Sequence, residues 1–298
     1  MDIQEVFSSI KNDLEAKFDF LPDKPEETVE STIKACWFTA SGSPKSCVEA
    51  EKYALPELTS AQFIVFRQLI KRRLNNVPLA HLTGRQHFNG IELLSDKRAL
   101  IPRRETELLA KKALALTHEV GKKKSSVMVM DICCGAGNLG LSLAMLNPRN
   151  IVFASDLSHD AVALTRDNIS FLNLHERVHA EQGDLFSAFS KEPHFKNTDL
   201  IICNPPYISS KKVGKMKAEI LDHEPYQAFD GGVSGATIIG KLISEAPAYL
   251  NKKGWVIFEV GIGQGEYVAL LCRRLNYYSE IKYIHDALGN IRVIMARK

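Results

Sequence analysis

The 298-residue sequence has few cysteines, little net charge and no long apolar run. Its six cysteines form no C-x-x-C pair and no His/Cys cluster with metal-ligand spacing, so we expect neither disulfides nor a metal site. A net charge of +3 is too small to indicate nucleic acid as a direct partner. The chain also lacks a membrane-length apolar run, an apolar signal core and an Arg-rich transit pattern, which predicts a cytoplasmic protein.

Apolar residues at helical spacing occupy residues 1–82, which we expect to form a small helical domain. Thr59 and Ser60 precede a predicted helix over 61–74, whose apolar stripe indicates either core packing or a surface for a protein substrate. Residues 83–101 are expected to form a β-hairpin linker, because Asn89-Gly90 is typical of a tight turn that needs positive φ.

Residues 102–298 are expected to form an α/β domain. A helix is predicted over 108–116, after which strands and helices alternate, as in a doubly wound, mostly parallel sheet. The predicted strands are 127–132, 151–155, 178–181, 200–203, 255–260, 281–285 and 292–296. The other predicted helices are 139–146, 160–172, 237–250 and 267–275. In such a sheet the ligand binds beyond the carboxyl ends of the strands.

A glycine-rich loop follows the first of these strands and opens a helix. It reads Asp131-Ile132-Cys133-Cys134-Gly135-Ala136-Gly137-Asn138-Leu139-Gly140. The G-x-G-x-x-G spacing suits NAD or S-adenosylmethionine, and Asp156, after the next strand, is placed to accept the ribose hydroxyls of either cofactor. The acidic Asp131 favours the cationic, phosphate-free S-adenosylmethionine. Asp184 is either a loop cap or an acceptor for the adenine amino group, with Leu185 or Phe186 covering the ring.

A second motif, Asn204-Pro205-Pro206-Tyr207, follows the apolar strand 200–203. Two prolines after a buried strand lack N–H donors and stiffen the backbone. The Asn204 side-chain oxygen and the Pro205 carbonyl can each accept one N–H of a planar NH₂ group, which orients its weakly nucleophilic nitrogen for methyl transfer. The Tyr207 ring can pack on the planar group and face a cationic methyl donor. We therefore expect Asn204, Pro205 and Tyr207 to be catalytic and 204–207 to bind the substrate.

Several stretches resemble the PrmC (HemK) family of peptide chain release factor glutamine methyltransferases. They are Asn204-Pro205-Pro206-Tyr207-Ile208, Leu100-Ile101-Pro102-Arg103-Arg104-Glu105-Thr106-Glu107, Leu79-Ala80-His81-Leu82-Thr83-Gly84, Glu224-Pro225 with Asp230-Gly231-Gly232, and Glu259-Val260-Gly261 with Gln264. The resemblance covers residue 78 to the C-terminus. It implies a seven-stranded class I (Rossmann-like) methyltransferase domain behind a small helical domain that helps to dock the release factor.

The same resemblance implies methylation of the glutamine side-chain nitrogen in the Gly-Gly-Gln motif of release factors. The family's contacts to S-adenosylmethionine correspond here to Cys133, Cys134, Gly135, Ala136, Gly137, Asp156, Asp184, Leu185 and Asn204, with Asp131 just before the loop. The chain departs from the family in two places: it has Cys133-Cys134-Gly135-Ala136-Gly137 for the usual G-T-G-S-G, and Arg104 for a proline. Cys133 suits the loop if its φ stays negative.

Four other functions remain open at this point. A ribosomal-protein glutamine methyltransferase and a nucleic-acid adenine methyltransferase would use the same tetrapeptide, the latter with a base-reading domain. An NAD-dependent oxidoreductase would use the glycine loop, and a non-catalytic binding protein is compatible with Cys133. The stretch 105–107 favours the release-factor branch.

Overall fold

The computed structural model describes residues 3–18, 20–21, 23–190, 193–216 and 218–298. The α-helices are α1 (Ile3–Lys17), α2 (Val29–Ala40), α3 (Cys47–Ala50), α4 (Ser60–Leu74), α5 (Leu79–Thr83), α6 (Glu107–Gly121), α7 (Asn138–Leu146), α8 (His159–Phe171), α9 (Ser210–Val213), α10 (Ala218–Leu221), α11 (Thr237–Glu245) and α12 (Gly265–Arg274). The 3₁₀ helices are η1 (Arg104–Thr106), η2 (Ser187–Phe189), η3 (Pro193–Asn197), η4 (Tyr226–Ala228) and η5 (Ala246–Ala248).

Two sheets lie within these described residues. The strands are β1 (Arg85–Phe88), β2 (Ile91–Leu94), β3 (Val127–Ile132), β4 (Asn150–Asp156), β5 (Val178–Gln182), β6 (Thr198–Cys203), β7 (Leu250–Glu259), β8 (Glu280–His285) and β9 (Ile291–Arg297). The larger sheet has the order β5-β4-β3-β6-β7-β9-β8, parallel from β5 to β7 and antiparallel at β9 and β8. This confirms the predicted seven-stranded, mostly parallel sheet.

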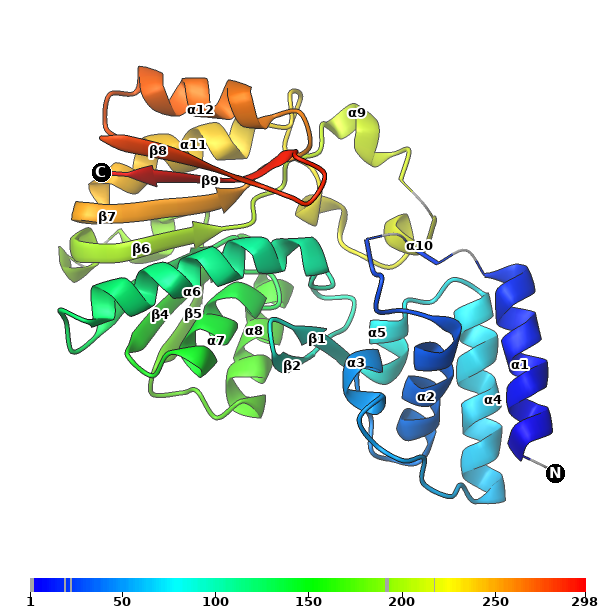
Figure 1. Ribbon diagram of the computed structural model, residues 1–298. Coiled ribbons are helices and arrows are strands. Elements are labelled where there is room, and N and C mark those ends of the chain that lie inside the picture. Colours follow the sequence, from blue (N-terminus) through cyan, green and yellow to red (C-terminus); the bar gives the residue numbers. More distant parts are fainter. Residues whose placement is uncertain (1–2, 19, 22, 191–192, 217) are drawn as a thin grey trace.

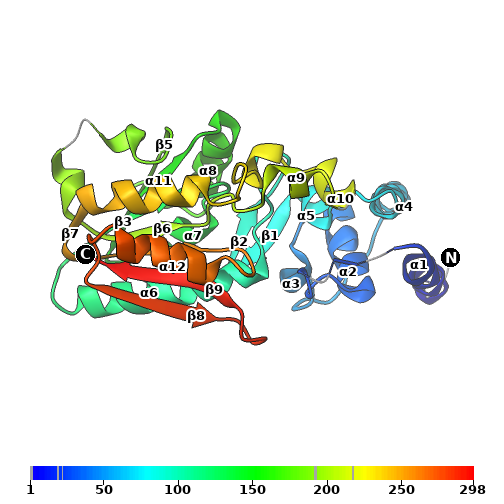
Figure 2. The same ribbon diagram turned by 90° about the horizontal axis from the view of Figure 1, so that it is seen from above.

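Helices cover both faces of this sheet, α6, α7 and α8 on one and α11 and α12 on the other (Figure 1, Figure 2). The side chains of β3 alternate between the two cores: Val127 and Val129 face the first group of helices, and Met130 and Ile132 face the second. All six side chains of the central strand β6 are buried, which explains its continuous apolar run.

The N-terminal helices α1 to α5 pack around a core of their own. Thr59 caps α4 in a capping box with Gln62, as its position before the apolar stripe predicts. Phe66, Leu69 and Ile70 of that stripe are buried in the helical core, which confirms the core interpretation of the stripe.

The hairpin β1–β2 turns at Asn89 and Gly90, whose φ angles of 46° and 86° match the predicted turn. Its buried Phe88 and Leu93 belong to the same core as α6 and α7. Asn168 of α8 fastens β2, accepting from the Leu94 N–H at 2.6 Å and donating to the Leu94 carbonyl at 3.1 Å. The hairpin is therefore packed against the α/β part, while the boundaries 1–82, 83–101 and 102–298 stay a prediction.

One predicted helix is too long. The stretch 237–250 is helical only to Glu245; η5 follows, and β7 begins at Leu250. Pro247 explains the end of the helix, because it has no N–H to donate to a helical carbonyl. The short helices α9 and α10 have too few residues for a periodic apolar pattern and were not predicted.

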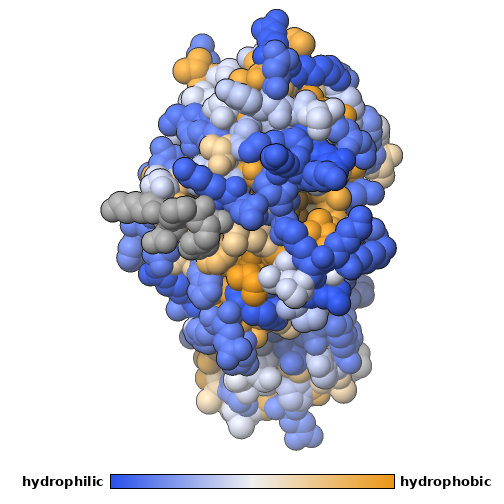
Figure 3. All heavy atoms as spheres, turned by 90° about the vertical axis from the view of Figure 1, so that its left-hand side faces the viewer, coloured by the Kyte–Doolittle hydropathy of each residue, from blue (hydrophilic) through white to orange (hydrophobic). Residues whose placement is uncertain are grey.

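The strands β6 and β7 point toward the hairpin and the N-terminal helices (Figure 1). Figure 3 shows the opposite end of the molecule, where hydrophilic side chains surround small apolar areas. Across the described residues, no helix combines the length and the apolar character needed to cross a membrane.

Candidate active site

A cavity of about 490 Å³ lies at the carboxyl ends of β3, β4 and β6 and is called the larger cavity below. The predicted site residues among its lining are Cys133, Cys134, Gly135, Asp156, Asp184, Leu185, Asn204 and Pro206. Asp131, Ala136, Gly137, Pro205 and Tyr207 are not part of this lining. The sequence thus located the cavity, because parallel strands bring their carboxyl ends to one edge of the sheet.

The glycine-rich loop turns through three residues with positive φ: Cys133 at 59°, Gly135 at 57° and Gly137 at 80°. The condition under which Cys133 would suit the loop, a negative φ, is not met: this first loop position takes the left-handed conformation that glycine adopts without strain. Gly137 has a second constraint, since a Cβ there would lie 2.8 Å from a Leu141 carbon and 2.9 Å from a Thr165 carbon. Gly137 is thus needed for packing behind the loop.

Asp156 holds the loop and faces the larger cavity. Its two carboxylate oxygens accept the backbone N–H groups of Gly135 and Ser158, each at 2.9 Å. Burial raises its pKa above the usual aspartate range, while these two amides act in the opposite direction. A carboxylate offers about four acceptor sites, so Asp156 can accept a further hydrogen bond from a ribose.

Asp131 lies behind the loop, fully buried. Its Oδ2 accepts the Gly140 N–H at 2.8 Å, and a Cβ on Gly140 would lie 2.9 Å from that oxygen, so Gly140 allows α7 to start close to β3. Its Oδ1 has no hydrogen-bond partner within the part of the chain that the structure describes. Burial raises the Asp131 pKa to about 7. Its contact with a cofactor stays a prediction.

Asp184 and Leu185 lie on the larger cavity next to β5, as predicted. Asp184 is exposed, with Lys241 Nζ 3.6 Å from its Oδ2, while the Leu185 carbonyl accepts from Ser155 Oγ at 2.8 Å. Phe186 is a core residue instead: its ring is buried and stacks on Tyr249 with 4.6 Å between the ring centroids. Of the two side chains proposed to cover an adenine, only Leu185 lines the cavity.

The tetrapeptide 204–207 separates the larger cavity from a second cavity of about 200 Å³, the smaller cavity below. Asn204 lines both cavities. Pro206 lines the larger cavity, and Pro205 and Tyr207 line the smaller one. The motif therefore forms a wall with Asn204 accessible from both sides.

Behind this wall, the backbone of residues 231–235 passes so close to the tetrapeptide that only glycine fits at two positions. A Cβ on Gly231 would lie 2.6 Å from the Pro206 carbonyl oxygen, and a Cβ on Gly235 would overlap the Tyr207 carbonyl oxygen. Gln264 donates its side-chain N–H to that Tyr207 carbonyl at 2.9 Å and accepts the Gly261 N–H at 2.9 Å. The close approach explains why glycines follow Asp230.

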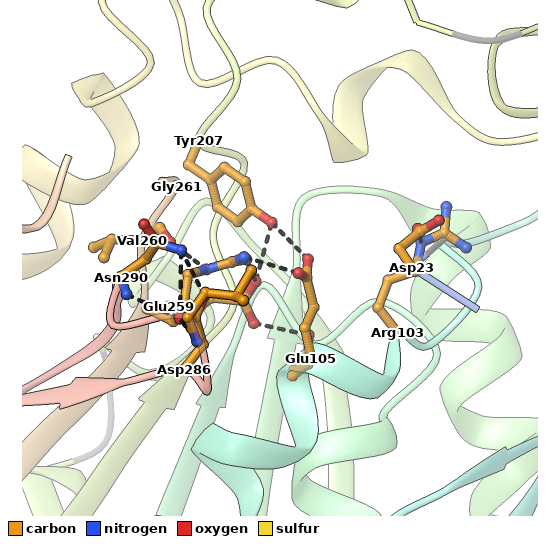
Figure 4. A network of polar contacts seen from close by, with 12 residues as sticks. Asp23, Arg103, Glu105, Tyr207, Glu259, Val260, Gly261, Asp286 and Asn290 are labelled. Carbon is orange, nitrogen blue, oxygen red and sulfur yellow. Dashed lines mark hydrogen bonds and ion pairs between the residues drawn. The ribbon is translucent and has the colours of Figure 1, made fainter. Parts of the chain in front are cut away.

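Two side chains of the tetrapeptide, Asn204 and Tyr207, are held by a polar network, and Figure 4 shows its part around Tyr207, Glu105 and Glu259. Asn204 Nδ2 donates to Thr106 Oγ1 at 3.2 Å, and Thr106 donates to Glu259 Oε2 at 2.8 Å. The Tyr207 hydroxyl donates to Glu259 Oε1 at 3.0 Å, and Arg292 Nη2 donates to the same oxygen at 3.1 Å. The sequence assigned no role to Thr106, Glu259 or Arg292; the first two were visible only as parts of the family stretches.

The two arginines that line the larger cavity are already paired. Arg98 Nη2 lies 2.8 Å from both Asp96 and Asp167, and Arg103 pairs with Glu224 at 2.6 Å. A pyrophosphate in this cavity would have to compete with these carboxylates for the two guanidinium groups. The carboxylates of Asp156 and Asp184 instead suit a cationic, phosphate-free cofactor with a ribose and an adenine amino group.

Comparison with known proteins agrees with this geometry. The methyltransferase small domain family model matches residues 109–233. The release factor glutamine methyltransferase of Thermodesulfovibrio yellowstonii is 31% identical over 243 residues, which cover 82% of this chain and 84% of that protein. The one of Rhodopirellula baltica is 31% identical over 258 residues, 85% and 86% of the two chains. The chain belongs to the release factor glutamine methyltransferase family.

Family membership confirms an S-adenosylmethionine-dependent methyltransferase and decides against NAD, the alternative that the glycine loop left open. Among solved structures, the catalytic domain of human METTL16 in complex with the MAT2A 3'UTR hairpin 6 superimposes with a TM-score of 0.52. At 12% identity over 77% of this chain and 91% of that one, this likeness shows the class I methyltransferase fold.

Proposed function

We propose that this family member methylates the side-chain amide nitrogen of the glutamine in the Gly-Gly-Gln motif of peptide chain release factors, and that it acts in the cytoplasm, where translation takes place. The names of its relatives support the substrate. We further propose that residues 1–82 form a domain that helps to dock the release factor.

The observation that carries this proposal is the orientation of Asn204. Its Nδ2 is engaged with Thr106, so its Oδ1 is left as an acceptor on the wall between the two cavities. An amide nitrogen is a weak nucleophile whose lone pair is delocalised into the carbonyl. Two acceptors, Asn204 Oδ1 and the Pro205 carbonyl, would fix the NH₂ group and stabilise the positive charge that develops on its nitrogen.

The larger cavity is the proposed site for the cofactor. Asp156 would accept from the ribose, Asp184 from the adenine amino group, and the loop around Cys133 and Gly135 would give close backbone approach. S-adenosylmethionine, when bound, supplies the methyl group on a cationic sulfur. The smaller cavity would receive the glutamine side chain, with the Tyr207 ring on its wall.

The test uses the purified full-length protein, labelled S-adenosylmethionine and a release factor. We expect mass spectrometry to find the label on the Gly-Gly-Gln glutamine. The Asn204→Ala variant should lose about 10²–10³-fold in kcat, as when one preorganised polar group is removed from an active site, while its cofactor Kd changes little.

Near-normal turnover of Asn204→Ala would show that the clamp described here is wrong. Label found on a ribosomal protein in a cell lysate lacking this activity, with none on the release factor, would overturn the substrate while leaving the glutamine chemistry in place.

A further inference from the structure

We propose that Glu259 is a positioning residue for methyl transfer: through the Thr106 hydroxyl it orients the Asn204 amide, and it holds the Tyr207 hydroxyl directly. That Glu259 thereby positions the groups that bind a substrate amide rests on the proposed function. Its effect on the orientation of Asn204 can be tested without any substrate. Glu259 ends β7 and is fully buried, so it acts through other residues rather than by touching a substrate.

The hydrogen bonds from Asn204 to Thr106 and from Thr106 to Glu259 are called the relay below. Which atom donates in each of them follows from the single proton of the Thr106 hydroxyl. Thr106 has one hydroxyl proton, which it donates to Glu259 Oε2 at 2.8 Å. Only lone pairs of the Thr106 oxygen then face Asn204, so Asn204 must present its NH₂ group, at 3.2 Å. The Asn204 oxygen is thereby turned toward the substrate, and a flipped amide would point its acceptor at another acceptor.

The second oxygen of Glu259 fixes Tyr207. Oε1 accepts from the Tyr207 hydroxyl at 3.0 Å and from Arg292 Nη2 at 3.1 Å. Arg292 is anchored in turn by Glu105 Oε2 at 2.8 Å and by the Val260 carbonyl at 3.2 Å. One carboxylate thus receives three donors from three parts of the fold: Thr106 of η1, the loop after β6, and β9.

This arrangement requires an ionised Glu259. A protonated carboxyl has to donate its own proton, so Glu259 could no longer accept from all three donors. The Tyr207 hydroxyl would then turn to its second acceptor, Glu105 Oε1 at 3.4 Å, and leave its position on Glu259. The charged groups facing Glu259 are Arg292, which favours the ion, and Glu105, which disfavours it. Burial is the largest influence and raises the Glu259 pKa to about 7. The side-chain amide of a substrate glutamine does not titrate near this pH. We therefore expect kcat to rise as pH increases through the Glu259 pKa.

The first experiment changes only the relay hydroxyl. Thr106→Val keeps the side-chain shape but removes the donor to Glu259 and the acceptor for Asn204; Thr106→Ser keeps both. We expect kcat of Thr106→Val to fall about tenfold, as for one hydrogen bond to a charged group, and Thr106→Ser to restore it. Because Thr106 also lines the larger cavity, cofactor Kd is measured alongside and should stay near the wild-type value.

A matched control removes a buried hydroxyl far from the site. Thr198, at the start of β6, is fully buried and donates to the Phe195 carbonyl at 2.8 Å. Thr198→Val should lower stability but leave kcat unchanged. If Thr106→Val behaves like Thr198→Val, the hydroxyl is merely structural and the relay is wrong.

The second experiment tests Glu259 itself. Glu259→Gln keeps the shape but brings an NH₂ group that faces donors, so kcat should fall and its rise between pH 6 and 8 should disappear, about one unit either side of the Glu259 pKa. An unchanged pH profile in this variant would overturn the role of the ionised carboxylate.

A third measurement needs no turnover, which separates this inference from the proposed function. The side-chain NH₂ signals of Asn204 in an NMR spectrum, assigned by their absence in Asn204→Ala, should shift in Thr106→Val and stay in place in Thr198→Val. Unshifted signals in Thr106→Val would refute the relay even if the true methylated protein proved to be another one.

Discussion

Arg103 Nη2 lies 2.6 Å from Glu224 Oε1, in an ion pair whose two side chains are both buried. The other Glu224 oxygen accepts the Ile101 N–H at 2.9 Å. Arg103 Nε also lies 3.2 Å from Asp23 Oδ2, in the segment between α1 and α2 (Figure 4). Since Arg103 lines both cavities, one guanidinium connects the N-terminal helices with the walls of the site.

We therefore expect Arg103→Met to destabilise the protein by about 3–5 kcal/mol, because the buried Glu224 carboxylate would lose its cation. The comparison is Asp23→Asn, which removes a carboxylate that is 33% exposed and should cost under about 1 kcal/mol. Urea unfolding at neutral pH measures both free energies. Equal losses in the two variants would show that the Arg103–Glu224 pair does not hold these walls together.

A second prediction concerns cofactor affinity. Asp156→Ala should raise the Kd of S-adenosylmethionine about 10–100-fold, the equivalent of a hydrogen bond to a charged group, and change kcat at saturation much less. Asp160, an exposed aspartate on α8, provides the control, and Asp160→Ala should bind normally. Calorimetric titration decides the matter: an unchanged Kd in Asp156→Ala would exclude the ribose role.

The sequence predicted the parts of the site that depend on local pattern. Asp156 and Asn204 follow apolar strands, and parallel strands bring their carboxyl ends together, so both were placed correctly on one cavity. The hydrogen-bond network that supports Asn204 and Tyr207 could not be predicted from the sequence. Thr106 and Glu259 are 153 residues apart, and Glu105 and Arg292 are 187 apart, so no periodicity connects them. Cys133 shows a different limit, because composition does not reveal a positive φ.

A third prediction concerns stability and pH. Burial raises the folded-state pKa of Asp131 from 3.8 to about 7, so between these values the folded protein holds a proton that the unfolded chain has lost. Asp131 therefore makes the free energy of unfolding fall as pH rises through this window, by at most about 1.4 kcal/mol per pH unit. The Asp131→Asn variant does not titrate, so its stability should fall less between pH 5 and pH 8.

The difference between wild type and Asp131→Asn isolates the contribution of Asp131 to the pH dependence of the free energy of unfolding. Burial lowers the pKa of His81 and His87, which favours the folded state at higher pH, and Glu259 acts in the same direction as Asp131. These contributions are common to wild type and Asp131→Asn and cancel in the difference. Urea unfolding curves whose midpoints shift in parallel with pH would show that Asp131 does not titrate in this range.

The last prediction concerns the loop position where this chain departs from its family. Cys133 has a φ of 59°, where a side chain costs about 1–2 kcal/mol relative to glycine. Cys133→Gly should therefore be more stable than Cys133→Ala by about 1 kcal/mol, once the greater unfolded-state freedom of glycine is subtracted. Both variants lose the thiol, so the comparison reports on the backbone alone.

Cys36, buried in the middle of α2, provides the opposite case. In a helix glycine is less favourable than alanine by about 1 kcal/mol, so Cys36→Ala should be the more stable variant there. Chemical denaturation of the four variants measures this reversal. If alanine were preferred at both positions, Cys133 would carry no backbone strain. The expected reversal would show why glycine is usual at this loop position, because the turn itself demands a positive φ.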